Sequence, residues 1–236
     1  MTLSVVSDIQ EQTSSMALWQ LMLDYYHAHG IDKVSYHHLS ADLQAPQSVT
    51  VNTDGFSRDW VCQYIERKLF LVDPITELAQ SVTRPFEWSD VGHLMRLSPE
   101  QKAYLITMHD AGVGEGFAFQ VFGPGLRNGY VGLGVARPQD MPSPALVLDF
   151  QIIAQAGHMK YCELNPPETP RGGLSPRERQ ILRWIARGKS NAIIADILEL
   201  SPHTVDTLVR RIFVKLGVAD RTTAAIQGVG AGLIVP

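Results

Sequence analysis

The sequence is poor in cysteine, in charge and in long apolar runs. Its two cysteines, Cys62 and Cys162, are far apart and form no Cys-x-x-Cys pair, which argues against a disulfide framework and a multi-cysteine zinc site. No run approaches the roughly 18 consecutive apolar residues that a membrane span needs, and the N-terminus lacks the basic start and apolar stretch of a signal peptide. We therefore expect a cytoplasmic protein with no metal site and no membrane contact.

The apolar content is nevertheless sufficient for a folded core. Hydrophobic residues make up 45% of the 236 residues and charged residues 19%, which is too apolar for wholesale disorder. The chain is long for one domain and short for three, so one medium and one small domain are the expected division.

Charge is distributed unevenly along the chain. Residues 1–170 contain 10 Lys and Arg against 19 Asp and Glu, a net charge of −9, whereas residues 171–236 contain 10 against 5, a net charge of +5. Between the two parts, three prolines and two glycines in residues 163–173 exclude a helix or a central strand. We predict a domain over 1–162, a linker over 163–173 and a basic domain over 174–236. The basic charge is compatible with nucleic-acid binding and also with an ordinary solvated surface.

Helix-start signals recur through the basic domain. Ser175, Pro176 and Glu178 form a capping box, and Ser201-Pro202 repeats the combination of a cap and a first-turn proline. The predicted helices cover about 176–187, 191–198, 202–217 and 222–232. The three-residue joint between the second and third has the length that a helix-turn-helix requires, so we expect an all-α domain of four helices.

The third of these helices has an apolar side and a polar side. The apolar stripe, which should face the other helices, consists of Val205, Val209, Ile212 and Leu216. In a helix-turn-helix the N-terminal part of this helix enters the major groove, and the residues predicted to reach base edges are His203, Thr204, Thr207 and Arg210. Arg211 and Lys215 suit phosphates. The alternative is that these are ordinary solvated helix residues.

This domain resembles the DNA-binding domain of LuxR-type transcription regulators. The resemblance spans roughly 60 residues. The matching segments are 174–182, 186–191, 194–195, 200–205 and 215–218, together with Arg221. Lys189 lies within them and joins the predicted DNA-binding residues. Leu208 stands where the family often has His, and because it borders the apolar stripe we expect a repacked edge there.

Residues 1–170 give a mixed pattern of helix and strand signals. Helical signals cover about 9–29, 57–70, 74–82, 99–111 and 144–161, and strand-like stretches lie near 34–40, 48–53, 116–122 and 129–136. The expected fold class is α+β, an α/β/α sandwich built on a small antiparallel sheet. A doubly wound response-regulator domain would instead show short parallel strands alternating with helices, and this pattern is not visible.

An aromatic stripe runs along one expected helix. Phe56, Trp60 and Tyr64 repeat every four residues, and Trp88 follows later. Such a stripe is more often core than pocket, but buried indole and phenol groups need polar partners. With the Asp73 carboxylate they could line an apolar cavity that has a few polar groups, the usual form of a small-molecule site. Asp73 precedes a proline and is equally suited to capping a helix, and if capping is its only role, Asp73→Asn should leave folding largely intact.

The spacing of these residues is similar to that of the acyl-homoserine-lactone-binding domain of quorum-sensing LuxR-type receptors. The match consists of Trp60-x-x-x-Tyr64, Asp73-Pro74, Pro85-Phe86-x-Trp88-Ser89-Asp90 and Gly112-Val113-x-x-Gly116. The resemblance implies that Trp60 donates to the lactone carbonyl, that Tyr64 donates to the acyl carbonyl, and that Asp73 accepts from the ligand amide. Trp88 would pack over the lactone ring and Gly116 would leave room beside it. Phe56, Ile75 and Gly132 complete the predicted ligand-binding set.

Departures from the family pattern concern the acyl end of the ligand. Residues 117–120 read Phe-Ala-Phe-Gln where the family commonly has proline, and Phe56 stands where some relatives carry Tyr. Gly132 stands where many members place a Ser or Thr hydroxyl, so a donor is missing and volume is added. Chain length, oxidation and an aroyl substituent therefore stay open.

The residue pattern gives no support for an enzyme. A Gly-x-Ser-x-Gly motif is absent, and His37 and His38 are expected to point to opposite faces of a strand. His158 and Cys162 share a helical face, but two ligands do not make a zinc site. We expect no cofactor.

The resemblance implies a regulator whose signal is an N-acyl-homoserine lactone. The expected partners are double-stranded DNA with an inverted repeat, bound by a homodimer, and RNA polymerase. The dimer surface is predicted on the helix 222–232 and on the helix face bearing Leu146, Phe150, Ile153, Gly157 and Tyr161. The alternative is an orphan regulator of the same fold that answers a non-lactone or foreign signal, or acts without ligand.

Overall fold

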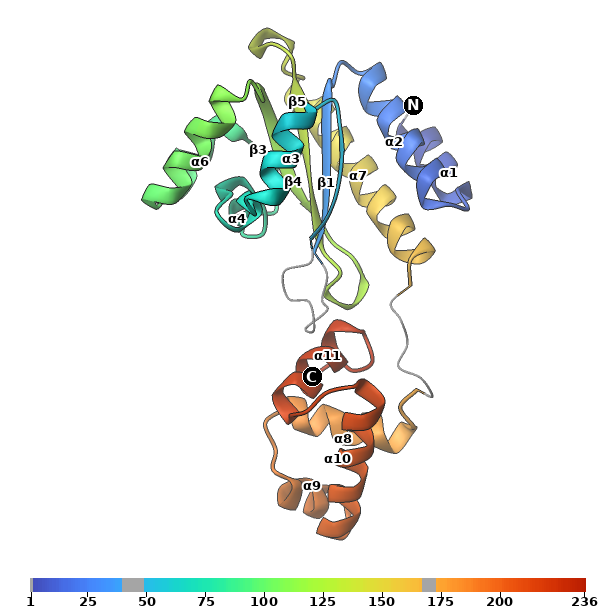
Figure 1. Cartoon of the computed structure of the whole chain (residues 1–236). Coiled ribbons are helices and arrows are strands. Elements are labelled where there is room, and N and C mark those ends of the chain that lie inside the picture. The colour runs from blue at the N-terminus through green and yellow to red at the C-terminus, as the bar shows by residue number, and fades with distance from the viewer. Residues whose placement is uncertain (1, 40–48, 167–172) are drawn as a thin grey trace. The chain divides into compact units, whose positions relative to one another are not determined.

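The structure, a computed structural model, describes residues 2–39, 49–166 and 173–236 (Figure 1). The chain divides into two units, one formed by most of the residues up to Asn165 and the other by the residues from Pro166 onward together with a few earlier ones, including Pro124–Arg127. Of the predicted linker 163–173, residues 167–172 lie outside the described part.

The N-terminal unit is built around an antiparallel sheet of five strands in the order β2-β1-β5-β4-β3. The strands are β1 Lys33–Leu39, β2 Val49–Asp54, β3 Phe86–Glu87, β4 Glu115–Val121 and β5 Gly129–Val135. In the central pair, Ser35 lies opposite Gly132 and His37 opposite Tyr130. Because side chains alternate between faces along a strand, these four positions share one face of the sheet.

Helices cover both faces of this sheet (Figure 1). Helices α1 Thr2–Glu11, α2 Ser15–Ala28 and α7 Pro144–Leu164 cover one face, and α3 Arg58–Glu66, α4 Pro74–Ala79, α5 Val91–Leu94 and α6 Pro99–Asp110 lie on the other. Short 3-10 turns occur at Leu69–Leu71, Trp88–Asp90, Pro124–Leu126 and Pro138–Asp140. A separate hydrophobic cluster fills each side, so the predicted α/β/α sandwich is confirmed. None of the helices in the described residues is long and apolar enough to span a bilayer.

The sequence prediction was wrong in three respects in this unit: it joined two helices, missed two short elements and misplaced the buried face of α7. The single helix expected over 9–29 is two helices, because the Ser14 side chain accepts a hydrogen bond from the Ala17 amide and starts α2 afresh. Strand β3 and helix α5 were not predicted. Both are too short to show a periodic pattern.

The third error concerns helix α7. Phe150 and Ile153, which were predicted to face a second subunit, are fully buried within the chain. A Cβ atom on Gly157 would lie 2.8 Å from the Met22 sulfur, so this face packs closely on α2. The part of the predicted dimer surface on α7 therefore belongs to the core, whereas the part on helix 222–232 stays a prediction.

The described residues of the C-terminal unit form four helices, as predicted. They are α8 Pro176–Ala186, α9 Asn191–Leu198, α10 Pro202–Leu216 and α11 Arg221–Gly230. The capping box at Ser175 is formed in full, and Ser201 and Asp220 cap α10 and α11. The apolar stripe of α10 is buried in one cluster, and Leu208 packs at its edge as expected.

Candidate functional site

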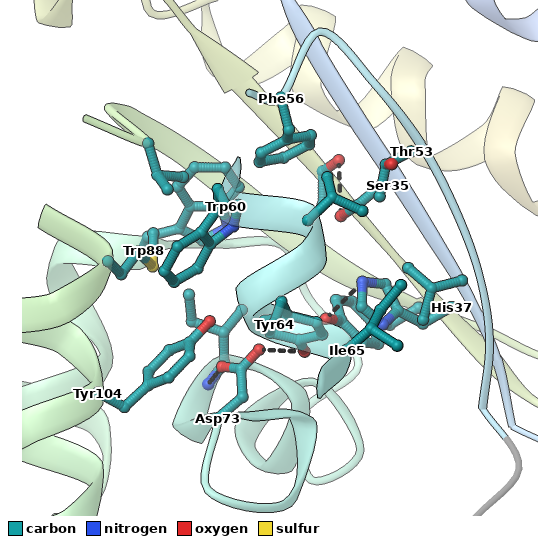
Figure 2. A pocket seen from close by; sticks show the side chains of 17 residues that line it. Ser35, His37, Thr53, Phe56, Trp60, Tyr64, Ile65, Asp73, Trp88 and Tyr104 are labelled. Atoms are coloured by element: carbon teal, nitrogen blue, oxygen red, sulfur yellow. Dashed lines mark hydrogen bonds between the residues drawn. The ribbon is translucent and has the colours of Figure 1, made fainter. Parts of the chain in front are cut away.

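A pocket opens on the sheet face that α3, α4 and α6 cover (Figure 2). It holds about 590 Å³ of space not filled by protein atoms, part of it open to solvent. Most of its wall is apolar, with a small number of hydroxyl, carboxylate and ring nitrogen groups, which is typical of a small-molecule site.

Seven of the eight residues predicted to bind ligand line this pocket. They are Phe56, Trp60, Tyr64, Asp73, Ile75, Trp88 and Gly132. The eighth, Gly116, lies beneath the Trp88 ring, where a Cβ atom would be 2.7 Å from the ring carbons. The structure therefore gathers the predicted set around one cavity, while the role of each residue toward a ligand stays a prediction.

Helix α3 supplies Trp60 and Tyr64 of the aromatic stripe, whereas Phe56 precedes the helix. It begins at Ser57, whose side chain accepts a hydrogen bond of 3.2 Å from the Trp60 amide. Trp60 and Tyr64, four residues apart, are buried on the same side of the helix. Within the described part of the chain, the Trp60 indole N–H has no hydrogen-bond acceptor. It is a donor that a ligand can use.

Asp73 makes the cap that its sequence context predicted and two further contacts. Its Oδ1 accepts from the Ile75 amide at 2.9 Å at the start of α4, and its Oδ2 accepts from the Tyr64 hydroxyl at 2.9 Å. The Thr76 hydroxyl lies 3.1 Å from the same Oδ2. Burial raises the pKa of the Asp73 carboxyl, and these three hydrogen bonds offset part of that effect. The Asp73 side chain thus both caps α4 and forms part of the pocket wall.

A chain of polar contacts leads from Asp73 across the pocket floor to strand β1. The Thr76 hydroxyl lies 3.0 Å from the Tyr130 hydroxyl, which in turn lies 2.9 Å from His37 Nε2. Burial lowers the pKa of His37 to about 3 and raises the pKa of Tyr64 and of Tyr130 well above the usual value, so all three are neutral near pH 7.

Trp88 lies on a part of the sheet that has no side chains. A Cβ atom at Gly116, Gly132 or Gly134 would lie 2.7, 3.5 or 3.0 Å from the indole, respectively. The ring therefore rests on the backbone of β4 and β5. Its Nε1 is buried and, among the described residues, has no acceptor.

Sequence reasoning missed the part of the wall that strands β1 and β2 provide. Ser35, His37 and Thr53 line the pocket, as do Tyr104 and Tyr130. The Ser35 hydroxyl lies where a side chain at position 132 would begin, 2.7 Å from the Cβ that glycine lacks. A serine on the neighbouring strand therefore brings a hydroxyl to the place where Gly132 removes one. The alternation along 33–39 could have indicated which residues share this face.

In the C-terminal unit, α9, a three-residue turn and α10 form the helix-turn-helix. The turn begins at Glu199, which adopts a left-handed conformation with φ of 53° and ends α9. The Asn191 amide donates to Asp206 at 2.6 Å and Arg177 donates to the Leu198 carbonyl at 2.9 Å. These contacts hold α9 against both neighbouring helices.

Helix α10 exposes most of the residues predicted to contact DNA. His203, Thr204, Arg210 and Arg211 are exposed, whereas Thr207 is half-buried. The Thr204 hydroxyl lies 2.8 Å from the Ser201 hydroxyl, and Thr207 donates to the His203 carbonyl at 3.0 Å. Both threonines are thus held locally, while no ion pair engages Arg210 or Arg211 in the described residues. The two arginines are the available cations of this face.

Lys215 has a partner that the sequence did not reveal. Its ammonium group lies 2.7 Å from Oε2 of Glu178, a carboxylate that is 2% exposed and belongs to the capping box of α8. Burial raises the pKa of Glu178, but hydrogen bonds from Lys215 and Ser175 lower it more, so the net pKa is below the usual value. Lys189, the remaining predicted residue, is half-buried, and its carbonyl accepts from Arg221.

The described residues contain no cluster of three or more His, Cys, Asp or Glu side chains that could hold a metal. His158 and Cys162 lie 3.6 Å apart as a packed pair, and His158 also meets the Tyr36 hydroxyl at 2.7 Å.

Two family models match the chain. The model described as "Autoinducer binding domain" matches residues 14–161, and the model described as "Bacterial regulatory proteins, luxR family" matches residues 173–227. The quorum sensing-dependent transcriptional regulator RpaR of Rhodopseudomonas palustris is 28% identical over 182 residues, which are 77% of this chain and 74% of RpaR. The regulatory protein SdiA of Escherichia coli is 29% identical over 187 residues, 76% of this chain and 75% of SdiA.

Solved structures show the same fold. A crystal structure of Escherichia coli SdiA aligns with a TM-score of 0.83 at 21% identity and covers 100% of this chain and 98% of that one. A structure of SdiA in complex with octanoyl-rac-glycerol aligns with a TM-score of 0.81 at 21% identity and covers 98% of this chain and 94% of that one.

Proposed function

The chain belongs to the LuxR family of bacterial transcription regulators with an autoinducer-binding domain, and on that premise we propose that an N-acyl-homoserine lactone controls its binding to DNA. In this proposal residues 1–162 bind the lactone and form a dimer in the cytosol, and residues 174–236 bind an inverted repeat. An aroyl group in place of the acyl chain is included. The protein is not an enzyme.

The pairing of Tyr64 with Asp73 is the observation that carries the ligand proposal. Their hydrogen bond joins one donor and one acceptor in the pocket, and a ligand amide offers one of each. When the amide N–H binds Asp73 and the amide carbonyl accepts from Tyr64, one hydrogen bond is exchanged for two and no buried polar group is left unsatisfied. The indole N–H of Trp60 then donates a hydrogen bond to the lactone carbonyl.

We propose a dimer because one DNA-binding helix offers only a small recognition surface. One helix in one groove makes few base contacts, and a two-fold dimer doubles them on half-sites about one helical turn apart. We propose that the dimer surface lies on the solvent face of α7, where Leu148, Ile152 and Met159 form one apolar stripe and are each about half exposed. Ile152→Arg should yield a monomer in sedimentation, whereas Leu3→Arg, at an equally apolar exposed site on α1, should not.

Calorimetric titration of the full chain with a panel of acyl- and aroyl-homoserine lactones tests the ligand proposal. We expect saturable binding of at least one lactone, and much weaker binding of its ring-opened form, because opening the lactone replaces the carbonyl that meets Trp60 with a charged carboxylate. The same lactone should change the affinity for an inverted-repeat DNA selected from a random library. The absence of binding across the panel would contradict the proposal.

The second candidate is an orphan regulator that answers a signal other than a lactone or needs none. It is favoured by one observation, that a structure of SdiA holds octanoyl-rac-glycerol, which has no amide N–H. Including that acylglycerol in the panel separates the two candidates. The second candidate would be supported if the acylglycerol binds more tightly than every lactone and if Asp73→Asn does not weaken acylglycerol binding.

A further inference from the structure

A second cavity lies on the face of the sheet that helices α2 and α7 cover (Figure 1). It holds about 510 Å³ of space not filled by protein atoms, part of it open to solvent, and ligand sites usually occupy about 300–1,000 Å³. Its wall comes from α2, α7 and strands β1, β2 and β5. The lining residues are Ser15, Leu18, Trp19, Met22, Tyr26, Val34, Tyr36, Asn52, Val131, Ala154, Gly157, His158 and Tyr161.

The sheet separates this second cavity from the pocket of Figure 2. Along β1, Val34 and Tyr36 line the second cavity, whereas Ser35, between them, lines the first pocket. Asn52 on β2 and Val131 on β5 likewise line the second cavity, while the residues on either side of each line the first. This is the alternation of side chains that every strand imposes. None of the described residues lines both spaces, so a ligand in one leaves the other empty.

The inner part of the second cavity is apolar. Leu18 and Val131 are buried there, and the Tyr36 hydroxyl is already paired with His158 Nδ1 at 2.7 Å. The Tyr26 hydroxyl is fully enclosed by protein, so Tyr26 offers the cavity only its ring. A floor of this kind gains free energy by covering hydrocarbon and has no polar group to offer a ligand.

The wall can also adjust to the thickness of a hydrocarbon chain. Met22 lies over Gly157, where a Cβ atom would be 2.8 Å from the Met22 sulfur. A methionine side chain is unbranched and adopts many rotamers, so it repacks around an inserted group more readily than a branched side chain does.

Two polar side chains at the rim are open to a ligand. Trp19 and Asn52 both line the cavity and are half-buried, so they lie where the cavity approaches the surface. In the described residues the Trp19 indole N–H and the Asn52 side-chain amide have no hydrogen-bond partner, and neither is fully enclosed by protein. The indole only donates, whereas the amide donates and accepts. A hydroxyl group, which does both, suits this rim.

The rim offers nothing to a charged group. Among the described residues that line the cavity there is no Lys, Arg, Asp or Glu. Lys160, a buried cation of α7, is paired with Glu163 at 2.8 Å. A carboxylate or ammonium group placed here would lose water without meeting an opposite charge, so the ligand is neutral.

We propose that the second cavity is a ligand site in its own right, which binds a straight alkyl chain with a neutral hydroxyl head group. The chain lies between α2, α7 and the sheet, and the hydroxyl lies at Trp19 and Asn52. This site is separate from the lactone pocket, and it does not depend on the proposed function.

The probes are the straight-chain alcohols from 1-hexanol to 1-decanol, titrated into the full chain by calorimetry. Each added methylene should tighten binding about fourfold until the cavity is filled, because each buries a further increment of apolar surface. Decanoate, which has the same chain length and is ionised at about pH 8, should bind at least about tenfold more weakly than 1-decanol.

The four tryptophans of the chain report where the alcohol binds. Each gives one indole N–H signal in a ¹H–¹⁵N spectrum, and replacement by Phe assigns it. We expect 1-octanol to shift the Trp19 signal and to leave those of Trp60, Trp88 and Trp184 in place. A shift at Trp60 and Trp88 without one at Trp19 would put the alcohol in the first pocket and overturn the inference.

Two variants change the second cavity, and a third is the matched control. Ala154→Leu fills the cavity from α7 and should weaken alcohol binding at least about tenfold. Ala156→Leu makes the same change on the same helix, at a half-buried residue that lines neither cavity, and should keep the affinity. Asn52→Leu keeps the side-chain volume but removes the amide, so binding should weaken about fivefold.

Urea unfolding of each variant shows whether it is folded, and if Ala154→Leu is not, Asn52→Leu decides. Equal alcohol affinity in the wild-type protein, Ala154→Leu and Asn52→Leu would overturn the inference, as would the absence of alcohol binding. Neither residue lines the first pocket, so both variants should bind a lactone as the wild-type protein does. A protein that binds alcohols but no lactone would contradict the proposed function alone.

Discussion

Replacing Asp73 by Asn separates the structural and ligand-binding roles of this carboxylate. The Asn oxygen can keep the cap, since Asn is as good a cap as Asp, and so accept from the Ile75 amide. The amide nitrogen then takes the place of Oδ2, toward which Tyr64 and Thr76 now donate at 2.9 and 3.1 Å. Two donors would face a third.

The size of the effect follows from those two contacts. Hydrogen bonds to a charged group contribute about 1.5–3 kcal/mol each, and rotation of the two hydroxyls to accept from the new amide recovers part of the loss. We expect the free energy of unfolding to fall by about 2–4 kcal/mol. The sequence-based expectation that the exchange would spare folding is therefore revised, because it considered the cap alone.

Urea unfolding followed by tryptophan fluorescence measures this loss, and calorimetry with the best-binding lactone measures the second role. Affinity should fall at least tenfold if the carboxylate accepts the ligand amide. Asp220→Asn is the matched control, because Asp220 caps α11 at an exposed site and should lose less than about 0.5 kcal/mol. A destabilised Asp73→Asn protein with unchanged affinity would refute the ligand role, and unchanged stability would refute the contact analysis.

Three further predictions concern His37, Arg210 and Lys215. Burial lowers the pKa of His37 to about 3, so the folded protein excludes a proton that the unfolded chain binds below about pH 6.5. The free energy of unfolding should therefore decrease as the pH falls below about 6.5, by up to about 1.4 kcal/mol per pH unit. Urea unfolding at several pH values should show this decrease in the wild-type protein and not in His37→Phe. Arg210→Ala should cost about 1–3 kcal/mol on the selected DNA and far less on random DNA in fluorescence anisotropy, and equal losses would assign it to a phosphate. Lys215→Ala should destabilise the C-terminal domain by about 1–3 kcal/mol in thermal unfolding, because it leaves the buried Glu178 carboxylate unpaired, and adding Glu178→Gln should restore part of the loss. An unchanged melting temperature, together with a weaker salt dependence of DNA affinity, would instead assign Lys215 to phosphate binding.

Local signals in the sequence predicted the C-terminal domain almost residue by residue. Capping residues such as Ser175 and Ser201 act on the adjacent turn, so the start of each helix is encoded within a few positions. The same kind of signal at Ser14 was overlooked, because apolar residues continue on both sides of the break and suggested one long helix. Strand β3 has only two residues, which is too short to show the alternation of a strand.

Contacts between residues that are far apart in the chain could not be predicted from the sequence. The pairing of Lys215 with Glu178 joins positions 37 residues apart, and the arrival of Ser35 beside Gly132 depends on the strand order. Helix α7 has apolar residues on two sides, so its pattern did not show that Phe150 faces the core while Ile152 faces solvent.

The glycine floor beneath Trp88 has a consequence for how this protein can change over generations. A single base change converts a glycine codon into one for alanine, and the Cβ atom so added would lie at graded distances from the indole, 2.7 Å at Gly116, 3.0 Å at Gly134 and 3.5 Å at Gly132. Substitution at Gly132 tightens the pocket least against Trp88 and instead displaces Ser35, whereas a Cβ atom at Gly116 would lie 2.4 Å from the Leu133 carbonyl oxygen, so both strand β5 and the ring would have to shift. A lineage carrying this floor can therefore narrow its ligand range in separate, unequal single steps. Widening it again requires restoring the same glycine, because every other residue brings a Cβ atom.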